Sequence, residues 1–235
     1  MANYSLEIFS LGPIDTNCTI LRNLKTKKAV IFDPGFAPEY AIASLEQNPD
    51  YELSRIWLTH AHWDHLGGVG KVIEAFPDKK IPLHLHSADE PLYRRIDEQV
   101  SAYGLPPVSL PSEFERLKTS DVFEEFPGAK ILHTPGHSPG SVSLYVDEEY
   151  ELSGPSNLLG AVSKSGKGFL ISGDLLFMGS AGRTDLWQGS YEDLKTSIQT
   201  KIYTLPPDTL VITGHGPLTT VQNEAKHNQV VSSSS

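Results

Sequence analysis

The segment His60-Ala61-His62-Trp63-Asp64-His65 places three histidines and an aspartate within six residues, and Leu66-Gly67-Gly68 follows it directly. It follows the apolar run 56–58, which is typical of a buried strand, and it leads into 69–76, whose apolar spacing is that of a helix. We therefore place it on a strand-to-helix turn. Side chains two residues apart on extended chain point the same way, so His60 and His62 can converge on one ion. Asp64 and His65 follow the bend, project in another direction and can hold a second ion close by.

The donor atoms indicate which ions the motif can bind. Imidazole nitrogen and carboxylate oxygen suit Zn²⁺, Fe²⁺ or Mn²⁺. The single cysteine, Cys18, lies in the apolar run 18–21, so we expect a buried, inert thiol and exclude a closed thiolate site. The alternative interpretation is a histidine-rich surface turn, or histidines satisfied by neighbouring hydrogen bonds. A lone histidine favours that alternative, whereas this cluster favours a catalytic metal site.

The remaining ligands are expected at the ends of other strands. His137 lies in Thr134-Pro135-Gly136-His137-Ser138-Pro139-Gly140, directly after the strand-like segment 129–133. Asp174 ends Ile171-Ser172-Gly173-Asp174, and His215 lies in Gly214-His215-Gly216-Pro217 after the apolar run 209–212. Glycines flank each of these residues and let the backbone approach an ion closely. The repetition of this pattern predicts a shared site.

In this order, the donors resemble those of a known family. The motif HxHxDH, then a later His, an Asp and a His, is similar to the metallo-β-lactamase-fold hydrolase superfamily, in its glyoxalase II-like (hydroxyacylglutathione hydrolase-like) branch. The resemblance runs from Thr16-Asn17-Cys18 and Asp33-Pro34-Gly35 through Gly214-His215-Gly216. It implies an α/β (α+β) fold, a four-layer αββα sandwich with the site at one edge of two sheets.

The resemblance also implies a role for each donor. It places three residues on a first metal: His60, His62 and His137. It places three on a second metal: Asp64, His65 and His215. Asp174 would bridge the two ions, and Asp64 and Asp174 are the expected catalytic residues. Lactam-cleaving members usually have cysteine at the position of Asp174. The implied cofactors are two divalent metal ions, with Zn favoured and Fe or Mn as alternatives.

A further segment, Gly182-Arg183-Thr184-Asp185-Leu186, looks like both the glyoxalase II-like hydrolases and the persulfide dioxygenases. We expect Arg183 and Asp185 in the outer shell, as an ion pair that orients the loop after Asp174. Alternatively, Arg183 contacts an anionic substrate. Full-length glyoxalase II binds glutathione with basic residues of a C-terminal helical extension, and Lys226 is the basic candidate after His215 here.

Two ions held in this way predict a hydrolase. Cations can lower the pKa of a bound water from about 15.7 towards about 7, so a metal-bridging hydroxide is the expected nucleophile. A metal would stabilise the oxyanion without a separate oxyanion loop. The preferred substrate is a small-molecule thioester such as the glutathione conjugate S-lactoylglutathione. The alternatives are a lactone or other ester hydrolase, and a persulfide dioxygenase with one Fe²⁺ on His60, His137 and Asp174. A vestigial binding protein is disfavoured because every expected ligand is present.

Two other motifs receive structural interpretations. Gly136-His137-Ser138-Pro139-Gly140 matches G-x-S-x-G, but Pro139 has no N–H for an oxyanion hole, so a serine mechanism is rejected. His84-Leu85-His86 lacks a following Asp-His, and helix-entry hydrogen bonding is expected there. We expect His133 within its strand and His227 in solvent.

Length and charge are consistent with one globular enzyme domain. The 235 residues suffice for a two-layer sheet core, and we expect a single domain over 1–229 with a disordered tail over 230–235. The net charge of −10 opposes nucleic-acid binding. No apolar run is long enough for a membrane span and no signal peptide is evident, so neither membrane nor nucleic acid is an expected partner and the expected location is cytoplasmic.

The remaining patterns predict the order of elements. An opening meander is expected over three strands at 6–11, 18–22 and 29–32. Helices are expected at 38–47, 87–103 and 190–203, with Pro91 in the opening turn of the second. The segment 147–167 is interpreted as an extended connection between two strands, either a lid or an inert loop.

Overall fold

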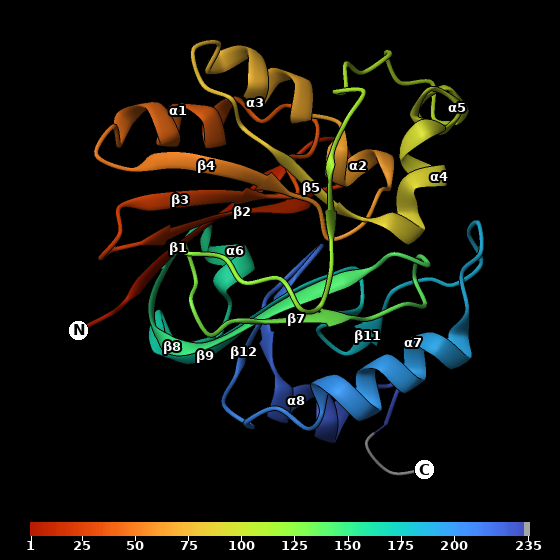
Figure 1. Ribbon diagram of the computed structural model, residues 1–235. Helices are drawn as coiled ribbons and strands as arrows, with labels where there is room; N and C mark the ends of the chain where they lie inside the picture. The colour runs from red at the N-terminus through yellow and green to blue at the C-terminus, as the bar shows by residue number, and fades with distance from the viewer. Residues whose placement is uncertain (233–235) are drawn as a thin grey trace.

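The computed structural model describes residues 1–232 (Figure 1). The strands are β1 (Tyr4–Leu11), β2 (Thr16–Asn23), β3 (Lys28–Phe32), β4 (Glu52–Trp57), β5 (Leu83–His86), β6 (Glu115–Leu117), β7 (Lys130–His133), β8 (Val142–Ser153), β9 (Ser165–Gly173), β10 (Leu176–Phe177), β11 (Ser180–Ala181), β12 (Leu210–Thr213) and β13 (Thr219–Thr220). The helices are α1 (Glu39–Gln47), α2 (Trp63–Leu66), α3 (Val69–Ala75), α4 (Glu90–Arg94), α5 (Ile96–Ala102), α6 (Ser156–Leu159), α7 (Tyr191–Ser197) and α8 (Val221–His227). A 3₁₀ turn, η1 (Ser87–Asp89), precedes α4, and a π-helical segment, η2 (Ile198–Ile202), continues α7.

The strands form two stacked layers that share one hydrogen-bonded path. Its order is β13-β12-β9-β8-β1-β2-β3-β4-β5-β6, and β7 pairs with β8 outside this order. The opening strands β1, β2 and β3 are antiparallel, as the predicted meander requires, and β3 to β6 run parallel. The layers are joined where Tyr4–Glu7 of β1 pairs in parallel with Tyr150–Ser153 of β8. In Figure 1, α1 and α3 cover one layer and α7 and α8 cover the other. The predicted αββα sandwich is confirmed.

The side chains of each central strand alternate between two faces of the sheet, and this alternation explains why the molecule has these layers. Val30 and Phe32 of β3 lie in the core cluster between the two sheet layers, whereas Ile31 lies in the cluster under α1 and α3. Strand β12 alternates in the same way, with Ile212 facing the central cluster and Val211 facing the cluster under α7 and α8. Successive side chains of a strand point to opposite faces, so each central strand contributes to two cores.

Two predicted elements differ in the structure. The helix expected at 87–103 is divided into η1, α4 and α5, because the chain leaves helical geometry at Arg95 (φ −103°, ψ 25°). Pro91 does occupy the first turn of α4. The segment 147–167 is not an extended loop: β8 runs on to Ser153, α6 follows, and β9 begins at Ser165. Its side chains Leu158 and Leu159 are buried in the central cluster, so this connection is part of the core.

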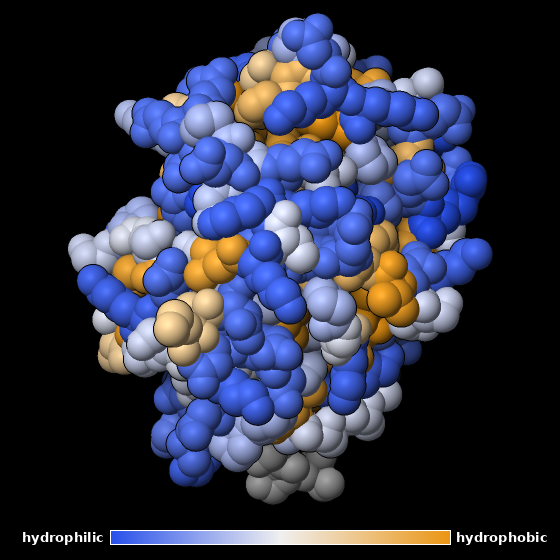
Figure 2. Space-filling model, turned by 60° about the vertical axis from the view of Figure 1, so that its left-hand side comes forward, coloured by the Kyte–Doolittle hydropathy of each residue, from blue (hydrophilic) through white to orange (hydrophobic). Residues whose placement is uncertain are grey.

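The packed part of the chain extends into the predicted tail. Val231 is buried against the α7 and α8 layer, and its carbonyl accepts a hydrogen bond of 2.7 Å from the Tyr203 hydroxyl. The rest of the predicted tail, 233–235, lies outside the described residues. Across 1–232, no helix has the length and apolar character needed to cross a membrane. Hydrophilic residues cover most of the face shown in Figure 2, and hydrophobic residues emerge there in separate patches.

The central cluster gives a first prediction. Phe169 is fully buried, and its ring meets the rings of Tyr4 and Tyr150 edge-on, each at a centroid distance of 5.8 Å. Replacing Phe169 with Ala is expected to lower the free energy of unfolding by about 3–5 kcal/mol, because it removes an aromatic side chain and leaves a cavity. Urea unfolding measures this loss. Val122→Ala is the control, since Val122 is 82% exposed and its loss is expected to change stability by less than about 0.5 kcal/mol. Equal effects of the two changes would refute this description of the core.

Candidate metal centre

The predicted donors all follow strand ends at one edge of the sandwich. His60 lies in the connection from β4 to α2, and His62 is the residue that precedes the first turn of α2. His137 lies in the connection from β7 to β8. Asp174 comes directly after β9, and His215 comes two residues after β12. Segments that are far apart in the sequence therefore deliver their side chains to one place.

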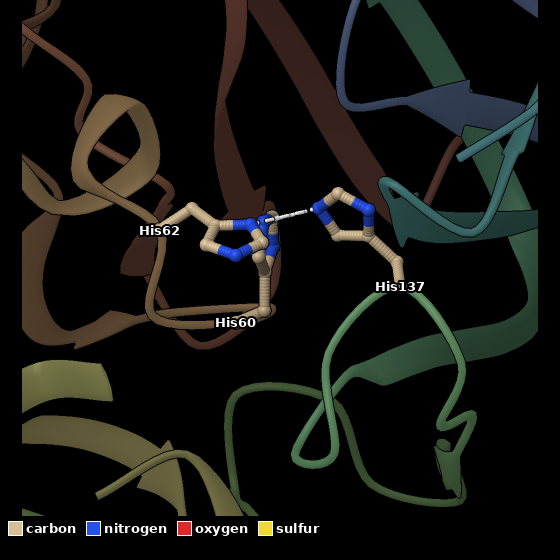
Figure 3. Close-up of side chains that lie close together, drawn as sticks. All are labelled: His60, His62 and His137. Atoms are coloured by element: carbon tan, nitrogen blue, oxygen red, sulfur yellow. Dashed lines mark hydrogen bonds between the residues drawn. The ribbon is translucent and has the colours of Figure 1, made fainter. Parts of the chain in front are cut away.

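A first group of donors consists of three imidazoles. His60, His62 and His137 are buried, and each offers a ring nitrogen within 4.8 Å of the others. His62 Nδ1 lies 2.8 Å from His137 Nε2, which lies 3.2 Å from His60 Nε2. Figure 3 shows the rings of His60 and His62, from the loop before α2, facing the ring of His137 from the opposite loop. The three nitrogens therefore surround a common point.

A second group lies beside the first. Asp64 Oδ2 is 3.1 Å from His65 Nε2 and 3.1 Å from His215 Nε2. His65 is fully buried, whereas the His215 side chain is 22% exposed and borders the open side of the site. Together these three residues form a donor set of two nitrogens and one oxygen.

Asp174 contacts members of both groups. Its Oδ1 lies 3.2 Å from His65 Nε2, and its Oδ2 lies 3.4 Å from His215 Nε2 and 3.6 Å from His137 Nε2. It also forms a third close donor set with His60 and His65. The structure thus brings all seven predicted donors together, with Asp174 between the two groups.

Neighbouring oxygens fix the orientation of several rings. His137 Nδ1 lies 2.8 Å from the Arg183 carbonyl, and His215 Nδ1 lies 3.0 Å from the Ile14 carbonyl. A carbonyl can only accept, so each Nδ1 carries the hydrogen and each neutral ring has its lone pair on Nε2, which faces the other donors. Imidazoles that bind metals typically use their second nitrogen in this way.

Asp33 is a site residue to which the sequence interpretation gave no role. Its carboxylate is buried and accepts hydrogen bonds of 2.7 Å from both the backbone N–H and the hydroxyl of Thr59. Its Oδ2 also lies 3.0 Å from His65 Nδ1, and the Thr59 hydroxyl lies 3.1 Å from His60 Nδ1. Asp33 therefore positions donors of both groups. An acidic residue between a strand and Pro34-Gly35 was the available signal in the sequence.

Asp89 is a second residue that sequence reasoning missed. It is fully buried, and its Oδ2 accepts from the Ala61 N–H at 3.0 Å and from the Ser138 hydroxyl at 2.7 Å. Its Oδ1 accepts from the Gly140 N–H at 2.5 Å. Ala61 lies between two donors and Ser138 follows a third, so one carboxylate ties together the two loops of the first group. Burial raises the pKa of Asp89, and the three accepted hydrogen bonds oppose that rise.

Burial and crowding set the charge of the first group. Burial lowers the pKa of His60 well below its usual value, and the neighbouring imidazoles His65, His137 and His62 lower it further. Burial also lowers the pKa of His62 to about 3, with His137 adding to the effect. Both rings are therefore neutral near pH 7, which is the form that binds a cation.

The second group has the opposite electrostatic character. Burial opposes charge on His65, but the carboxylates Asp64, Asp174 and Asp33 outweigh it and raise the pKa of His65 well above its usual value. Burial likewise opposes charge on His215, but hydrogen bonds to Asp174 and Asp64 raise its pKa to about 10. Without a metal, protons on these rings compensate the buried carboxylates. A cation can replace the protons.

Buried polar atoms of the site that lack hydrogen-bond partners are also consistent with bound cations. His65 Nε2 and Asp174 Oδ1 are buried and make no hydrogen bond of acceptable geometry, although they lie 3.2 Å apart. Buried polar atoms in proteins are almost always satisfied, so an ion between such groups explains the pair. The backbone leaves room for close approach at Gly214, where a Cβ would lie 1.9 Å from Asp174 Oδ1. The donor set suits divalent cations such as Zn²⁺, Fe²⁺ and Mn²⁺.

A cavity of about 680 Å³ opens onto the donors. Five donors line it: His62, Asp64, His137, Asp174 and His215. The other lining residues are Ile14, Trp63, Leu92, Gln99, Tyr103, Phe177, Ser180, Ala181, Arg183, Leu186 and Trp187. The predicted ion pair is present, with Arg183 Nε 2.7 Å from Asp185 Oδ1 and Arg183 Nη2 2.8 Å from Oδ2.

The other histidines take structural positions. His86 Nδ1 accepts from the Ala88 N–H at 3.3 Å, which is the predicted helix-entry contact. His84 contacts the Arg55 guanidinium at 3.1 Å, away from the donors. His133 ends β7, stacks on His86 at a centroid distance of 4.2 Å and contacts the Pro139 carbonyl. Cys18 is fully buried, as predicted, and burial raises the pKa of its thiol.

Comparison with known proteins gives consistent matches. The family model described as "Metallo-beta-lactamase superfamily" matches residues 11–150 and 146–215. The chain is 30% identical to "Hydroxyacylglutathione hydrolase GloC" of Haemophilus influenzae, with 98% of this chain and 100% of that protein covered. It is 35% identical to "Probable metallo-hydrolase YqgX" of Bacillus subtilis, with 93% of each chain covered.

Two solved structures are also similar. The first is described as "Crystal structure of TTHA1623 in a di-iron-bound form", with a TM-score of 0.76, 35% identity, and 95% of this chain and 99% of that chain covered. The second is described as "Crystal structure of BLEG-1 B3 metallo-beta-lactamase", with a TM-score of 0.74, 37% identity, and 95% and 98% covered.

The position of Asp89 gives a second prediction. Asp89→Asn keeps the shape but presents an amide N–H₂ to a donor, so it is expected to loosen the two loops of the first group. Divalent-cation affinity, measured by competition with a chromogenic chelator, should fall about 10–100-fold while the circular dichroism spectrum is retained. Glu90→Gln is the matched control, because Glu90 forms ion pairs with Arg94 and Arg116 at the surface. A loss in the control as large as in Asp89→Asn would contradict the assignment.

The pKa shifts give a third prediction. Because the pKa values of His65 and His215 are raised, the latter to about 10, the metal-free chain holds protons there at neutral pH. Binding a cation must release them, so the apparent affinity for Zn²⁺ should increase as pH rises from about 6.5 towards about 10. Titration calorimetry at pH 7 in two buffers of different ionisation enthalpy should report release of about one to two protons per chain. An affinity independent of pH would show that these rings are neutral in the metal-free protein.

Proposed function

We propose that this chain holds two divalent cations and cleaves a thioester. The chain belongs to the metallo-β-lactamase superfamily and is a metal-dependent hydrolase. His60, His62 and His137 would hold the first cation. Asp64, His65 and His215 would hold the second, and Asp174 would contact both. The short distances between these groups and the orientation of their rings support this division.

The position of His215 is the observation that carries the proposal. Its Nε2 lies 3.1 Å from Asp64 Oδ2 and 3.4 Å from Asp174 Oδ2, so it completes the second group. A single iron on His60, His137 and Asp174, as in a persulfide dioxygenase, leaves Asp64 and His215 without a role. The similarity to a protein that was solved with two irons favours a two-cation site.

The nature of the cations is the next part of the proposal. We favour Zn²⁺, with Fe²⁺ or Mn²⁺ as alternatives, since all three accept imidazole and carboxylate ligands. When bound, such a pair supplies a Lewis acid for the substrate carbonyl and a nucleophile from water near neutral pH.

The chain's own residues prepare the site for that chemistry. Asp33 and Asp89 hold the donor loops in place, so little reorganisation is needed when a substrate binds. The lowered pKa of His60 and of His62 keeps both rings unprotonated at working pH. Ser138 donates to Asp89 and is buried, so it serves the loop and not nucleophilic attack.

S-Lactoylglutathione is the first substrate to test. The match with the hydroxyacylglutathione hydrolase GloC covers the full length of that relative, so GloC has no extension outside the aligned region. A β-lactam is the second candidate, favoured by the 37% identity to the B3 enzyme. Against it, the superfamily members that cleave lactams usually have cysteine at the position of Asp174.

The function is tested by metal analysis and anaerobic turnover. Purified protein is expected to contain about two divalent ions per chain and to cleave S-lactoylglutathione without oxygen, faster than a lactone or a β-lactam in the same panel. His215→Ala removes one ligand of the second cation. It should lower the metal content towards one ion and reduce kcat/KM by about 100-fold or more.

His227→Ala serves as the matched control, since His227 is exposed and its ring contacts Asn223 of the same helix. It should retain both ions and full activity. One tightly held iron, oxygen uptake with glutathione persulfide, and an active His215→Ala variant would together replace the hydrolase proposal with the dioxygenase. Faster β-lactam cleavage would replace the thioester.

A further inference from the structure

One side of the cavity that opens onto the donors is built from aromatic and aliphatic side chains. We call it the apolar wall, and it consists of Trp63, Leu92, Tyr103, Phe177, Leu186 and Trp187. It belongs to segments on both sides of the site, from α2, α4 and the end of α5 to the strand β10 and the loop before α7. A substrate arm that extends from the donors along this side therefore contacts apolar surface.

Contacts within the protein hold the part of the wall around Trp63 in place. The Trp63 ring lies 5.6 Å from the Phe36 ring and 4.8 Å from the Tyr103 ring, measured between centroids. The backbone N–H of Trp63 donates to Gln99 Oε1 at 3.1 Å. Gln99 Nε2 in turn donates to the carbonyls of Ala61 and Leu92, at 3.1 and 2.9 Å. The Gln99 amide is thus occupied by the protein, although it lines the cavity.

Charge is scarce along the same surface. Apart from the proposed ligands, Arg183 is the one fully charged side chain among the lining residues of the described chain, 1–232. Its Nε and Nη2 donate to the two carboxylate oxygens of Asp185. A glutathione arm carries two carboxylates and an ammonium group, and moving charges from water onto apolar surface without partners is unfavourable. An apolar arm gains free energy in the same place.

Tyr103 is an exposed aromatic residue of the apolar wall. Its ring is 55% exposed and stacks at an angle on Trp63, at the last turn of α5. A large aromatic side chain left half in water beside a cavity is the kind of surface that a ligand covers. Trp187, partly buried in the cluster under α1 and α3, continues the same surface.

We infer that the site selects thioesters with one uncharged apolar arm, aryl or medium-length alkyl, which lies on the apolar wall. This inference rests on the proposed thioester hydrolysis and narrows its substrate class. In the reaction, the oxygen of water becomes bonded to the acyl carbon, the carbon–sulfur bond breaks, and sulfur leaves as the thiol. S-Lactoylglutathione, polar in one arm and charged in the other, is accordingly a slower substrate.

The first experiment compares matched thioesters on metal-loaded protein. Acetyl, hexanoyl and phenylacetyl thioesters of N-acetylcysteamine vary the acyl arm, and acetyl thioesters of thiophenol and hexanethiol vary the thiol arm after correction for their spontaneous hydrolysis. In at least one series, kcat/KM should exceed that of acetyl-N-acetylcysteamine and of S-lactoylglutathione by about 10-fold or more. The series that responds identifies the arm that meets the wall. Flat kcat/KM values across both series would overturn the inference.

A variant assigns the effect to the wall. The double change Tyr103→Ala and Trp187→Ala should reduce the ratio of apolar to acetyl kcat/KM towards one, because it removes two rings of the wall. Tyr40→Ala is the matched control, since Tyr40 is an aromatic residue of α1 that is 78% exposed and does not line the cavity. It should leave the ratio unchanged. An unchanged ratio in the double variant would overturn the inference.

A binding measurement separates this inference from the proposed function. The chain has three tryptophans, and Trp63 and Trp187 line the cavity while Trp57 is fully buried in the core. Uncleavable S-hexyl and S-benzyl thioethers of N-acetylcysteamine should shift the tryptophan fluorescence of the metal-free protein at concentrations at least about 10-fold lower than the S-methyl thioether. Trp187→Phe should reduce that shift.

The two measurements fail independently. Tight thioether binding with no thioester cleavage would end the proposed function and leave the apolar preference in place. Thioester cleavage with equal binding of the methyl, hexyl and benzyl thioethers would end the apolar preference and leave the hydrolase in place.

Discussion

The structure depends on burying several carboxylates beside imidazoles at the junction of two sheet layers. The ring of His65 is fully enclosed and lies within 3.2 Å of oxygens from Asp33, Asp64 and Asp174. Three negative charges in so small a volume require positive charge nearby, whether from protons or from metal ions. The raised pKa of His65 is the metal-free solution to this requirement. The close donor sets around the same ring are what a cation would use instead.

Burying such a cluster of charged groups is unfavourable in free energy, so the surrounding chain has to hold these groups in place. Strand alternation gives each layer two apolar faces, so that the strand ends are rigid where the donors begin. The donor loops are then held by side chains outside the donor set, with Asp33 on one side and Asp89 on the other. The stable core and the donor loops therefore act together, because they hold a cluster of buried charged groups that would be unfavourable without them.

The seven donors could be found from the sequence because their signal is local. The spacing within HxHxDH is recognisable by itself, and His137, Asp174 and His215 each follow a recognisable strand. Asp33 also follows a strand, but its role and that of Asp89 depend on partners in other segments of the chain, Thr59, Ala61 and Ser138, which the local pattern does not show. The break at Arg95 and the packed α6 were missed for the same reason, because tertiary packing overrode the local pattern. The apolar wall is likewise assembled from distant segments and is visible only in the fold.

The pairing of β1 with β8, which is the seam between the two layers, has a consequence for how the molecule folds. Tyr4 of β1 lies opposite Tyr150 of β8, so the pairing that unites the layers closes most of the chain into a single loop. Contacts of such high sequence separation slow folding, because chain entropy is lost before the contact is gained. His60, His62, Asp64 and His65 belong to the segment before this seam, whereas Asp174 and His215 belong to the segment after it. The second group, which joins His215 to Asp64 and His65, therefore forms only once the two layers have met, and cation uptake by that group would report their meeting.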